Sequence, residues 1–355
     1  MAKFFLTLSH WTSKGFRGHG YVKVLTYPLT PEMITIPSSA TLNINKKMFN
    51  FLLYASASLI WGSTWLAIKL QLTQVPPILS VAYRFCLAAL ILLAYCRLTK
   101  KQLNFSVRDH WFMALQGFTL FGLSYCGSYL ATVYMTSGLV AVVFSTILMW
   151  NILNLRIFMG QPVAWRAFWG GILGLSGICI VFWHDLATFT ATRGLIGLLI
   201  ALAGAYLASV GNVVGSRNAK NGVPVTQANA FGMGYGGLLT LFIHFAMDGT
   251  LTMDWTFGYL GPMLYLTLFG SIVAFGCYML LISRIGAEYA AYVTLLMPII
   301  ALIISTLFEG YLWTANALLG VALVLAGNLI ILMPQFKFRQ IKGQVKRREY
   351  FAKVD

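Results

Sequence analysis

The chain is poor in charge, and above all in acidic charge. Only 10% of its 355 residues are charged, and 25 lysines and arginines stand against 9 aspartates and glutamates. With 59% hydrophobic residues and a mean hydropathy of +0.76, it is too apolar for a soluble domain. The cations lie in short loops between apolar runs and in a basic tail, which is typical of cytoplasmic loops and not of nucleic-acid binding. We therefore predict a polytopic membrane protein whose partners are the lipid bilayer and a small molecule, with no nucleic acid.

The sequence also lacks the residue clusters of enzymes and metal sites. All five cysteines lie inside apolar runs without metal-ligand spacing: Cys86, Cys96, Cys126, Cys179 and Cys277. The five histidines are scattered and have neither metal nor triad spacing. There is no glycine-rich phosphate loop and no pair of carboxylates. We expect no disulfide framework, no metal, no cofactor and no catalytic residue.

Long apolar segments dominate what is present. There are ten such segments, and the first begins at Met48. Each has close to the about 20 residues that a membrane-spanning helix needs. They are 48–70, 77–97, 110–132, 136–158, 164–184, 194–214, 226–247, 257–282, 287–308 and 313–333. The sequence therefore predicts an all-α membrane protein with ten transmembrane helices.

The loops differ in charge between the two sides of the membrane. The cations collect after the even-numbered segments, at Arg97, Lys100, Lys101, Arg108, Arg156, Arg166, Arg217, Lys220 and Arg284. The opposite loops offer only Lys69 and Arg193. Because cytoplasmic loops carry the excess of lysine and arginine, both termini should be cytoplasmic, in a multi-pass protein of the cell's inner or plasma membrane.

The chain repeats itself with a shift of 148 to 150 residues. The shift carries Thr119–Gly122 (TLFG) onto Thr267–Gly270 (TLFG), and Gly127–Tyr129 onto Gly276–Tyr278. Each repeat holds five segments, an odd number, so the second must enter the membrane in the opposite sense. We predict two inverted five-helix repeats, residues 48–184 and 194–333, an arrangement typical of secondary transporters.

Basic segments flank the two repeats. Residues 1–47 read as a disordered leader, and residues 334–355 read as a cytoplasmic tail. The leader could be an organelle presequence, or it could come from a start codon placed too far upstream, since Met48 opens directly onto the first apolar segment. We favour the second interpretation and expect residues 1–47 to be dispensable.

Arg84 is the leading candidate for a binding residue. An arginine at the centre of a spanning helix costs about 2.5–3.5 kcal/mol on insertion scales and is normally turned toward protein or water. Counted from Pro77, Arg84 lies about 10 Å into a hydrocarbon core about 30 Å thick. The repeat shift places Gly232 or Met233 at the equivalent position, without charge. A site between the halves should be chemically lopsided, unless Arg84 merely holds helices together.

The other substrate-binding candidates are polar, aromatic or helix-breaking residues within the apolar segments. They are Trp61, Ser63, Trp65, Tyr83, Tyr129, Tyr278, Asn154 and Pro298. Tyr129 and Tyr278 are repeat mates, and we expect them to face each other across the pseudo-two-fold axis. Each candidate could instead serve helix packing. For Lys69 and Glu309 we favour structural roles, as an interfacial lysine and a helix cap.

Several motifs, taken in order, resemble one known family. They are IWGSTWLAIK (Ile60–Lys69), the prolines Pro76 and Pro77, YRF (Tyr83–Phe85), LFGSIVAFGCYMLL (Leu268–Leu281), RIGAEYAAYVTLLMPIIALI (Arg284–Ile303) and FEG (Phe308–Gly310). Over residues 48–333 the chain is similar to the EamA-type permeases of the drug/metabolite transporter superfamily. It departs from them in lacking a proline in the fourth segment and in having Gly160–Gln161 where many members have a glutamate.

The resemblance implies ten helices in two repeats, and transport of small metabolites, often export of amino acids and related compounds, without nucleotide hydrolysis. We therefore predict a secondary transporter that works by alternating access, as an exporter or exchanger. A channel and a membrane-embedded enzyme are the alternatives. A homodimer stays open, as do the metabolite, the direction of transport and the coupling ion.

Overall fold

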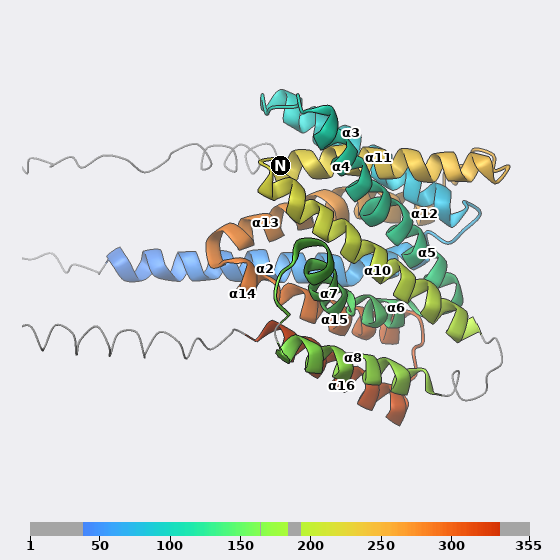
Figure 1. Ribbon diagram of the computed structural model, residues 1–355. Coiled ribbons are helices and arrows are strands. Elements are labelled where there is room, and N and C mark those ends of the chain that lie inside the picture. The colour runs from blue at the N-terminus through green and yellow to red at the C-terminus, as the bar shows by residue number, and fades with distance from the viewer. Residues whose placement is uncertain (1–37, 164, 184–192, 334–355) are drawn as a thin grey trace, which may run out of the picture.

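Helices make up the fold of the computed structural model, which describes residues 38–163, 165–183 and 193–333 (Figure 1). No strand occurs within these ranges. The first half contains α2 (Ser38–Leu70), α3 (Pro77–Leu98), α4 (Val107–Gln116), the π-helix η1 (Gly117–Leu123), α5 (Ser124–Tyr134), α6 (Ser137–Phe144), α7 (Ile147–Met159) and α8 (Trp165–Val181). The second contains α10 (Arg193–Lys220), α11 (Val225–Ala246), α12 (Phe257–Tyr265), the π-helix η2 (Leu266–Val273), α13 (Ala274–Ile285), α14 (Ala287–Ala290), α15 (Val293–Phe308) and α16 (Ala315–Leu332).

Each predicted apolar segment falls on one helix or on a run of consecutive helices. Within the described residues, six helices are long and apolar enough to cross a membrane, and two shorter apolar helices, Trp165–Val181 and Val293–Phe308, accompany them. Membrane-spanning helices satisfy every backbone polar group internally, which suits a chain of this hydropathy. The architecture is that of a multi-pass membrane protein.

The first helix begins earlier than the sequence predicts. α2 starts at Ser38, so residues 38–47 are helical and do not belong to the disordered leader predicted for 1–47. The apolar pattern marks only the part of a helix that meets lipid, whereas backbone hydrogen bonds can continue into the polar residues before it. Residues 1–37 of the predicted leader and the predicted tail, 334–355, lie outside the described residues.

Both halves interrupt their helices at repeat-related positions. The two TLFG sequences, Thr119–Gly122 and Thr267–Gly270, lie within η1 and η2. Further along, α6 and α7 meet at Ser145–Thr146, and α14 and α15 at Ala291–Tyr292, next to Thr294. Thr146 and Thr294 are 148 residues apart (294 − 146). π-bulges and broken helices are frequent at functional sites, so these interruptions mark the part of the fold where a site is expected.

The packing of helices is symmetric under exchange of the two halves. α3 packs on η2 as α11 packs on η1, and α2 packs on α13 and α15 as α10 packs on α5 and α7. The pairs α3–α11 and α8–α16 each join one half to the other, and both pairs run side by side in Figure 1. This pattern fits the two-repeat architecture.

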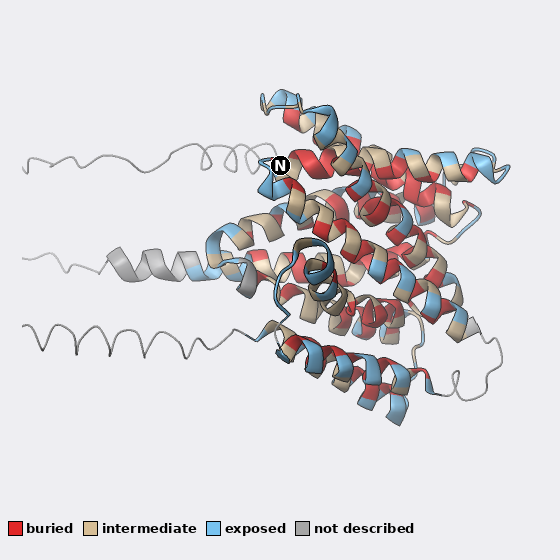
Figure 2. Ribbon diagram, in the orientation of Figure 1, coloured by how far each residue is buried: buried red, intermediate tan, exposed pale blue. Residues whose placement is uncertain are grey.

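Glycines allow the α8–α16 pair to approach closely. A Cβ atom added at Gly170 would lie 2.6 Å from the backbone oxygen of Gly327, and one at Gly177 would lie 2.5 Å from that of Gly320. Small residues at such positions let the backbones of membrane helices touch. Buried residues gather in the centre of the bundle, while the outer faces of α8 and α16 are exposed (Figure 2).

Candidate substrate-binding site

Arg84 is enclosed by protein in the first half of α3. Only 1% of its surface is exposed, and among the described side chains it is the one fully buried lysine, arginine, aspartate or glutamate. The one salt bridge in the described part of the chain joins Arg217 and Asp109, so Arg84 has no carboxylate partner there. Its Nη1 atom is buried without any hydrogen-bond partner. Burying a cation without a counter-ion is costly, which makes Arg84 a candidate for contact with an anionic ligand.

The local sequence explains why this arginine points inward. Pro77 starts α3 after Pro76, and the buried residues Ser80, Arg84 and Ala88 recur every four positions. This spacing puts them on one face of the helix, toward η2 and α11. The side chain of Arg84 therefore belongs to the interface between the two halves.

A hydroxyl group on η2 accepts a hydrogen bond from the guanidinium of Arg84. Arg84 Nε donates to Ser271 Oγ at 3.1 Å, and Ser271 Oγ donates to the backbone oxygen of Leu266 at 3.0 Å. The second bond spans five residues, which is the reach of a π-helical turn. A Cβ atom added at Gly270 would lie 3.3 Å from Arg84 Nη2, so glycine leaves the room that the guanidinium occupies. The winding of η2 thus presents the hydroxyl that orients Arg84.

Two aromatic rings flank the guanidinium. Its central carbon lies 5.0 Å from the centroid of the Phe85 ring and 4.8 Å from that of Tyr125. Rings at this range stabilise a cation through their negative faces, by about 2 kcal/mol when the pair is desolvated. The two rings therefore help to stabilise the buried guanidinium.

Tyr129 and Gln71 continue the polar cluster. The Tyr129 hydroxyl donates to Gln71 Oε1 at 2.6 Å, and it also interacts electrostatically with Arg84. Both Tyr129 and Gln71 have an exposed fraction of 0%, and Gln71 Nε2 has no partner. The sequence did not single out Gln71, which follows the last turn of α2 and reads as a loop residue. The only available signal was an amide close behind an apolar segment.

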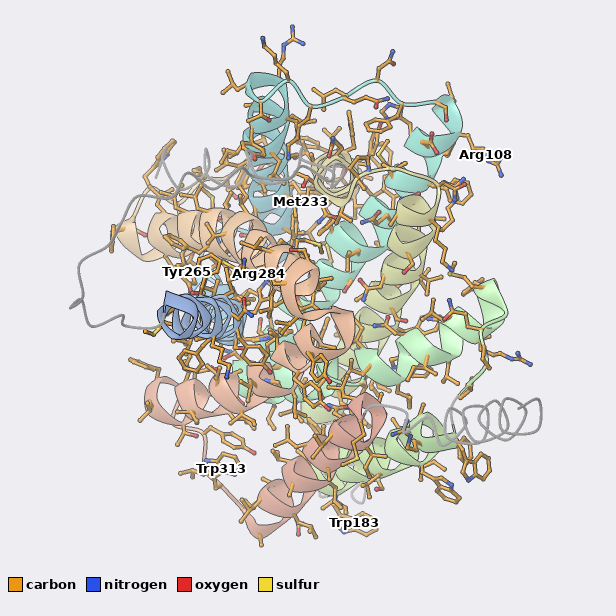
Figure 3. The ribbon with its side chains drawn as sticks, turned by 90° about the vertical axis from the view of Figure 1, so that its left-hand side faces the viewer. Arg108, Trp183, Met233, Tyr265, Arg284 and Trp313 are labelled. Carbon is orange, nitrogen blue, oxygen red and sulfur yellow. The ribbon has the colours of Figure 1, made fainter. Side chains whose placement is uncertain are left out.

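The aromatic residues of α2 contact two different regions: Trp61 contacts η2 of the second half, and Trp65 contacts α6 of the first half. Trp61 Nε1 donates to the backbone oxygen of Gly270 at 3.1 Å, and the Ser63 hydroxyl lies 2.6 Å from that of Tyr265. Figure 3, which looks along α2, shows Tyr265 beside that helix. Trp65 packs against Phe144, with ring centroids 5.1 Å apart. Trp61 therefore contacts η2, the element whose Ser271 accepts a hydrogen bond from Arg84, whereas Trp65 packs against α6.

The other predicted binding residues lie apart from Arg84. Tyr83 donates to the backbone oxygen of Thr252 at 3.0 Å, and Asn154 donates to Ser209 at 3.0 Å. Pro298 is buried inside α15. Tyr278 packs against Trp61, in a different core cluster from Tyr129. The expected face-to-face arrangement of Tyr129 and Tyr278 is not among the described contacts.

Lys69 and Glu309 have structural partners. Lys69 Nζ donates to the backbone oxygen of Thr132 at 2.6 Å. Glu309 accepts hydrogen bonds from the backbone nitrogen and the hydroxyl of Ser137, the first residue of α6. A carboxylate at a helix N-terminus is stabilised by the free N–H groups there, so Glu309 caps α6 and does not pair with Arg84.

The equivalent place in the second half holds no charge. A Cβ atom added at Gly117 of η1 would lie 2.2 Å from the backbone oxygen of Gly232, so the backbones of η1 and α11 are in contact there. Met233 beside it has an exposed fraction of 0%. The two repeat-related places therefore differ in charge, which is the asymmetry expected of a site between the halves.

A separate cavity of about 150 Å³ lies between α7, α8 and α16. It is lined by Ile152, Leu155, Gln161, Pro162, Arg166, Ala167, Ile331 and Met333. It contains none of the predicted binding residues.

Comparisons with known proteins agree on one family. The EamA-like transporter family matches this chain twice, over residues 48–183 and 195–333. The chain is 24% identical to the uncharacterized transporter YoaV of Bacillus subtilis, covering 81% of this chain and 97% of YoaV. It is 27% identical to the uncharacterized inner membrane transporter YedA of Escherichia coli, covering 79% of this chain and 89% of YedA.

A solved crystal structure has a similar fold, with a TM-score of 0.57 and 18% sequence identity, covering 79% of this chain and 95% of the other. At that identity the likeness concerns the fold alone. The two family matches span most of the chain and the relatives are named as transporters. We conclude that this membrane protein belongs to the EamA-like transporter family, a permease family of the drug/metabolite transporter type.

Proposed function

We propose that the protein is a secondary transporter that moves a small metabolite carrying an anionic group, an amino acid or a related compound, by alternating access. The observation that supports this is Arg84, a fully buried cation without a carboxylate partner in the described chain, at the interface between the halves. A charged side chain within a membrane bundle is a functional-site hypothesis by default. The substrate's anionic group supplies the partner that Arg84 lacks.

Two contacts on opposite ends of the bundle are suited to act as gates. At one end Ser80 of α3 meets Tyr259 of α12, with hydroxyls 2.9 Å apart, and at the other His110 of α4 meets Tyr235 of α11 at 2.9 Å. His110 and Tyr259 are 149 residues apart (259 − 110), which is the repeat shift. Each contact joins a helix of one half to a helix of the other, so opening one end while the other stays closed exposes Arg84 to alternate sides.

The full proposal has ten crossings in two inverted five-helix repeats, residues 48–184 and 194–333. The first residues of α2 and the last of α16 lie on the same side of the bundle (Figure 1), as an even number of crossings requires. The excess of cations in the loops after the even-numbered segments supports a cytoplasmic position for that side. YedA is named as an inner membrane transporter, and we propose the same membrane for this chain, with export or exchange as the direction.

Counterflow in proteoliposomes tests the proposal. Purified protein is reconstituted, loaded with unlabelled compound, and given the same labelled compound outside, over a panel of amino acids and related acids. A carrier accumulates label transiently and saturates. Flux that rises without saturation favours a channel, and chemical conversion of a compound favours an enzyme. Either result overturns the proposal.

A further inference from the structure

We infer that the preferred substrate is an organic acid with a hydrogen-bond acceptor beside its carboxylate and no ammonium group, such as a 2-oxo acid, and that Gln71 is its second binding residue. This rests on the proposed transport function and narrows the substrate class of the same site. A zwitterionic amino acid is then the poorer substrate.

Two buried donors in the same cluster have no partner. Arg84 and Gln71 are only 1% and 0% exposed. Their atoms Arg84 Nη1 and Gln71 Nε2 are inaccessible to solvent, yet neither forms a hydrogen bond. Tyr129 links the two side chains, because it donates to Gln71 and interacts electrostatically with Arg84. Leaving buried donors unpaired is costly, so native proteins rarely do so without a functional reason. A ligand with two acceptor groups satisfies both.

The direction of the Tyr129 hydrogen bond makes Gln71 a donor to the ligand. The positive charge of Arg84 draws the phenolic oxygen toward itself, which turns the O–H away, toward Gln71 Oε1 at 2.6 Å. The amide oxygen of Gln71 is thereby occupied and its NH₂ group is free. The cluster as a whole therefore offers hydrogen-bond donors.

Among the described side chains, an ammonium group finds no buried anion. The acidic side chains that the structure describes are Asp109, Asp248, Asp254 and Glu309, and none of them is buried. Glu309 is engaged with Ser137. The rings of Phe85 and Tyr125, which could attract a cation, already face the guanidinium of Arg84. Desolvating an ammonium group beside an arginine is unfavourable, so the site selects a net anion.

Matched pairs of compounds test this selectivity in the counterflow assay. L-alanine is compared with pyruvate, and L-glutamate with 2-oxoglutarate, since each pair differs by an amino group in place of an oxo group. We expect the oxo acid to have at least a tenfold higher ratio of maximal rate to half-saturation constant in at least one pair. Equal or better transport of the amino acids overturns the inference while leaving the transport function intact. Absence of counterflow for every compound removes the transport function itself.

Two substitutions assign the second contact to Gln71. Gln71→Leu removes the free donor, and we expect it to raise the half-saturation constant of the oxo acid about tenfold. Gln71→Glu adds a negative charge and should lower the oxo-acid to amino-acid ratio at least tenfold. Gln102→Glu, at an exposed amide that bonds only the backbone of Asn104, is the matched control.

Melting curves in detergent accompany both Gln71 variants, so that loss of folding is not read as loss of binding. The inference fails if a folded Gln71→Leu protein keeps the wild-type half-saturation constant. It also fails if a folded Gln71→Glu protein keeps the wild-type selectivity ratio.

Discussion

The two crossings at which a helix of one half meets the π-helix of the other are related by the repeat, yet they are closed differently. Where α11 meets η1, glycine backbones touch, and an added Cβ at Gly236 would lie 2.6 Å from the oxygen of Gly117. Where α3 meets η2, the Arg84 guanidinium lies between the helices, bonded to Ser271. At the crossing of α11 and η1 the backbones are in direct contact, whereas at the crossing of α3 and η2 the charged side chain of Arg84 fills the space between the helices.

This difference explains how a symmetric scaffold can hold an asymmetric ligand. The crossing of α11 and η1 at Gly117 and Gly236 supplies close packing, and we propose that its small residues also let the helices slide. In the proposed function, the crossing of α3 and η2 at Arg84 supplies the chemical specificity. We therefore expect substitutions at the first to alter stability and those at the second to alter substrate recognition.

The largest effect should come from Arg84→Ala. Loss of one partner of a buried charged contact typically costs about 2–5 kcal/mol, so counterflow should fall below detection. Transport kinetics beside a melting curve in detergent give the measurement, and Arg284→Ala is the control, because Arg284 bonds Asn50 at an exposed position. A purely structural role predicts that the melting temperature falls together with transport.

Locking either end should also stop transport, but reversibly. Cysteines at Ser80 and Tyr259, or at His110 and Tyr235, are introduced after replacement of the five native cysteines. A short reducible bifunctional thiol reagent should then abolish counterflow, and reduction should restore it. Transport that continues with either end cross-linked would show that the two halves do not move as proposed.

A smaller effect is expected at the crossing of α11 and η1. In Gly117→Ala the new Cβ would meet the oxygen of Gly232 at 2.2 Å, and overpacking of this kind costs about 1–3 kcal/mol. The melting temperature should fall, while the half-saturation constant of the folded protein stays near the wild-type value. Gly276→Ala, where nothing lies within 4 Å, is the matched control. A change in substrate preference in Gly117→Ala would break the division between the two crossings.

The smallest expected effect is on the pH dependence of stability, through Asp109 at the start of α4. The hydrogen bond from Ser106, with Arg217 nearby, lowers the pKa of Asp109 below its ordinary value. A carboxylate with a lowered folded-state pKa contributes stability above its unfolded pKa of about 3.9 and loses it as the pH falls through the folded value. Wild type should therefore melt above Asp109→Asn at pH 7, and the difference should shrink as the pH falls below about 4 and through the lowered folded-state pKa. A difference that does not change with pH would contradict the assignment.

The sequence predicted the features that periodicity, charge and internal similarity control. The apolar segments coincide with helices because lipid demands long apolar runs, and Arg84 is conspicuous because a cation there is costly. The asymmetry of the site followed from comparing Arg84 with Gly232 in the repeat.

Features that depend on contacts between distant residues could not be predicted. The π-helical turns of η1 and η2 have the same apolar pattern as an α-helix, although the repeated TLFG marks their places. Gln71 acquires a role only because Tyr129 bonds it across 58 positions of sequence. Pro298, inside α15, is a local signal near the helix break at Ala291–Tyr292, but the break at Ser145–Thr146 has no proline in α7 to signal it.

The most direct test of the central claim, that Arg84 binds the anionic group of the substrate, is the half-saturation constant of Arg84→Lys measured beside its melting temperature. Lysine keeps the charge but loses the planar fork that meets a carboxylate in two bonds. We predict a protein that assembles and melts near wild type, with a half-saturation constant raised about tenfold or more, equivalent to about 1.4 kcal/mol or more of lost binding. An unchanged half-saturation constant, or a loss of transport explained wholly by unfolding, would contradict the claim.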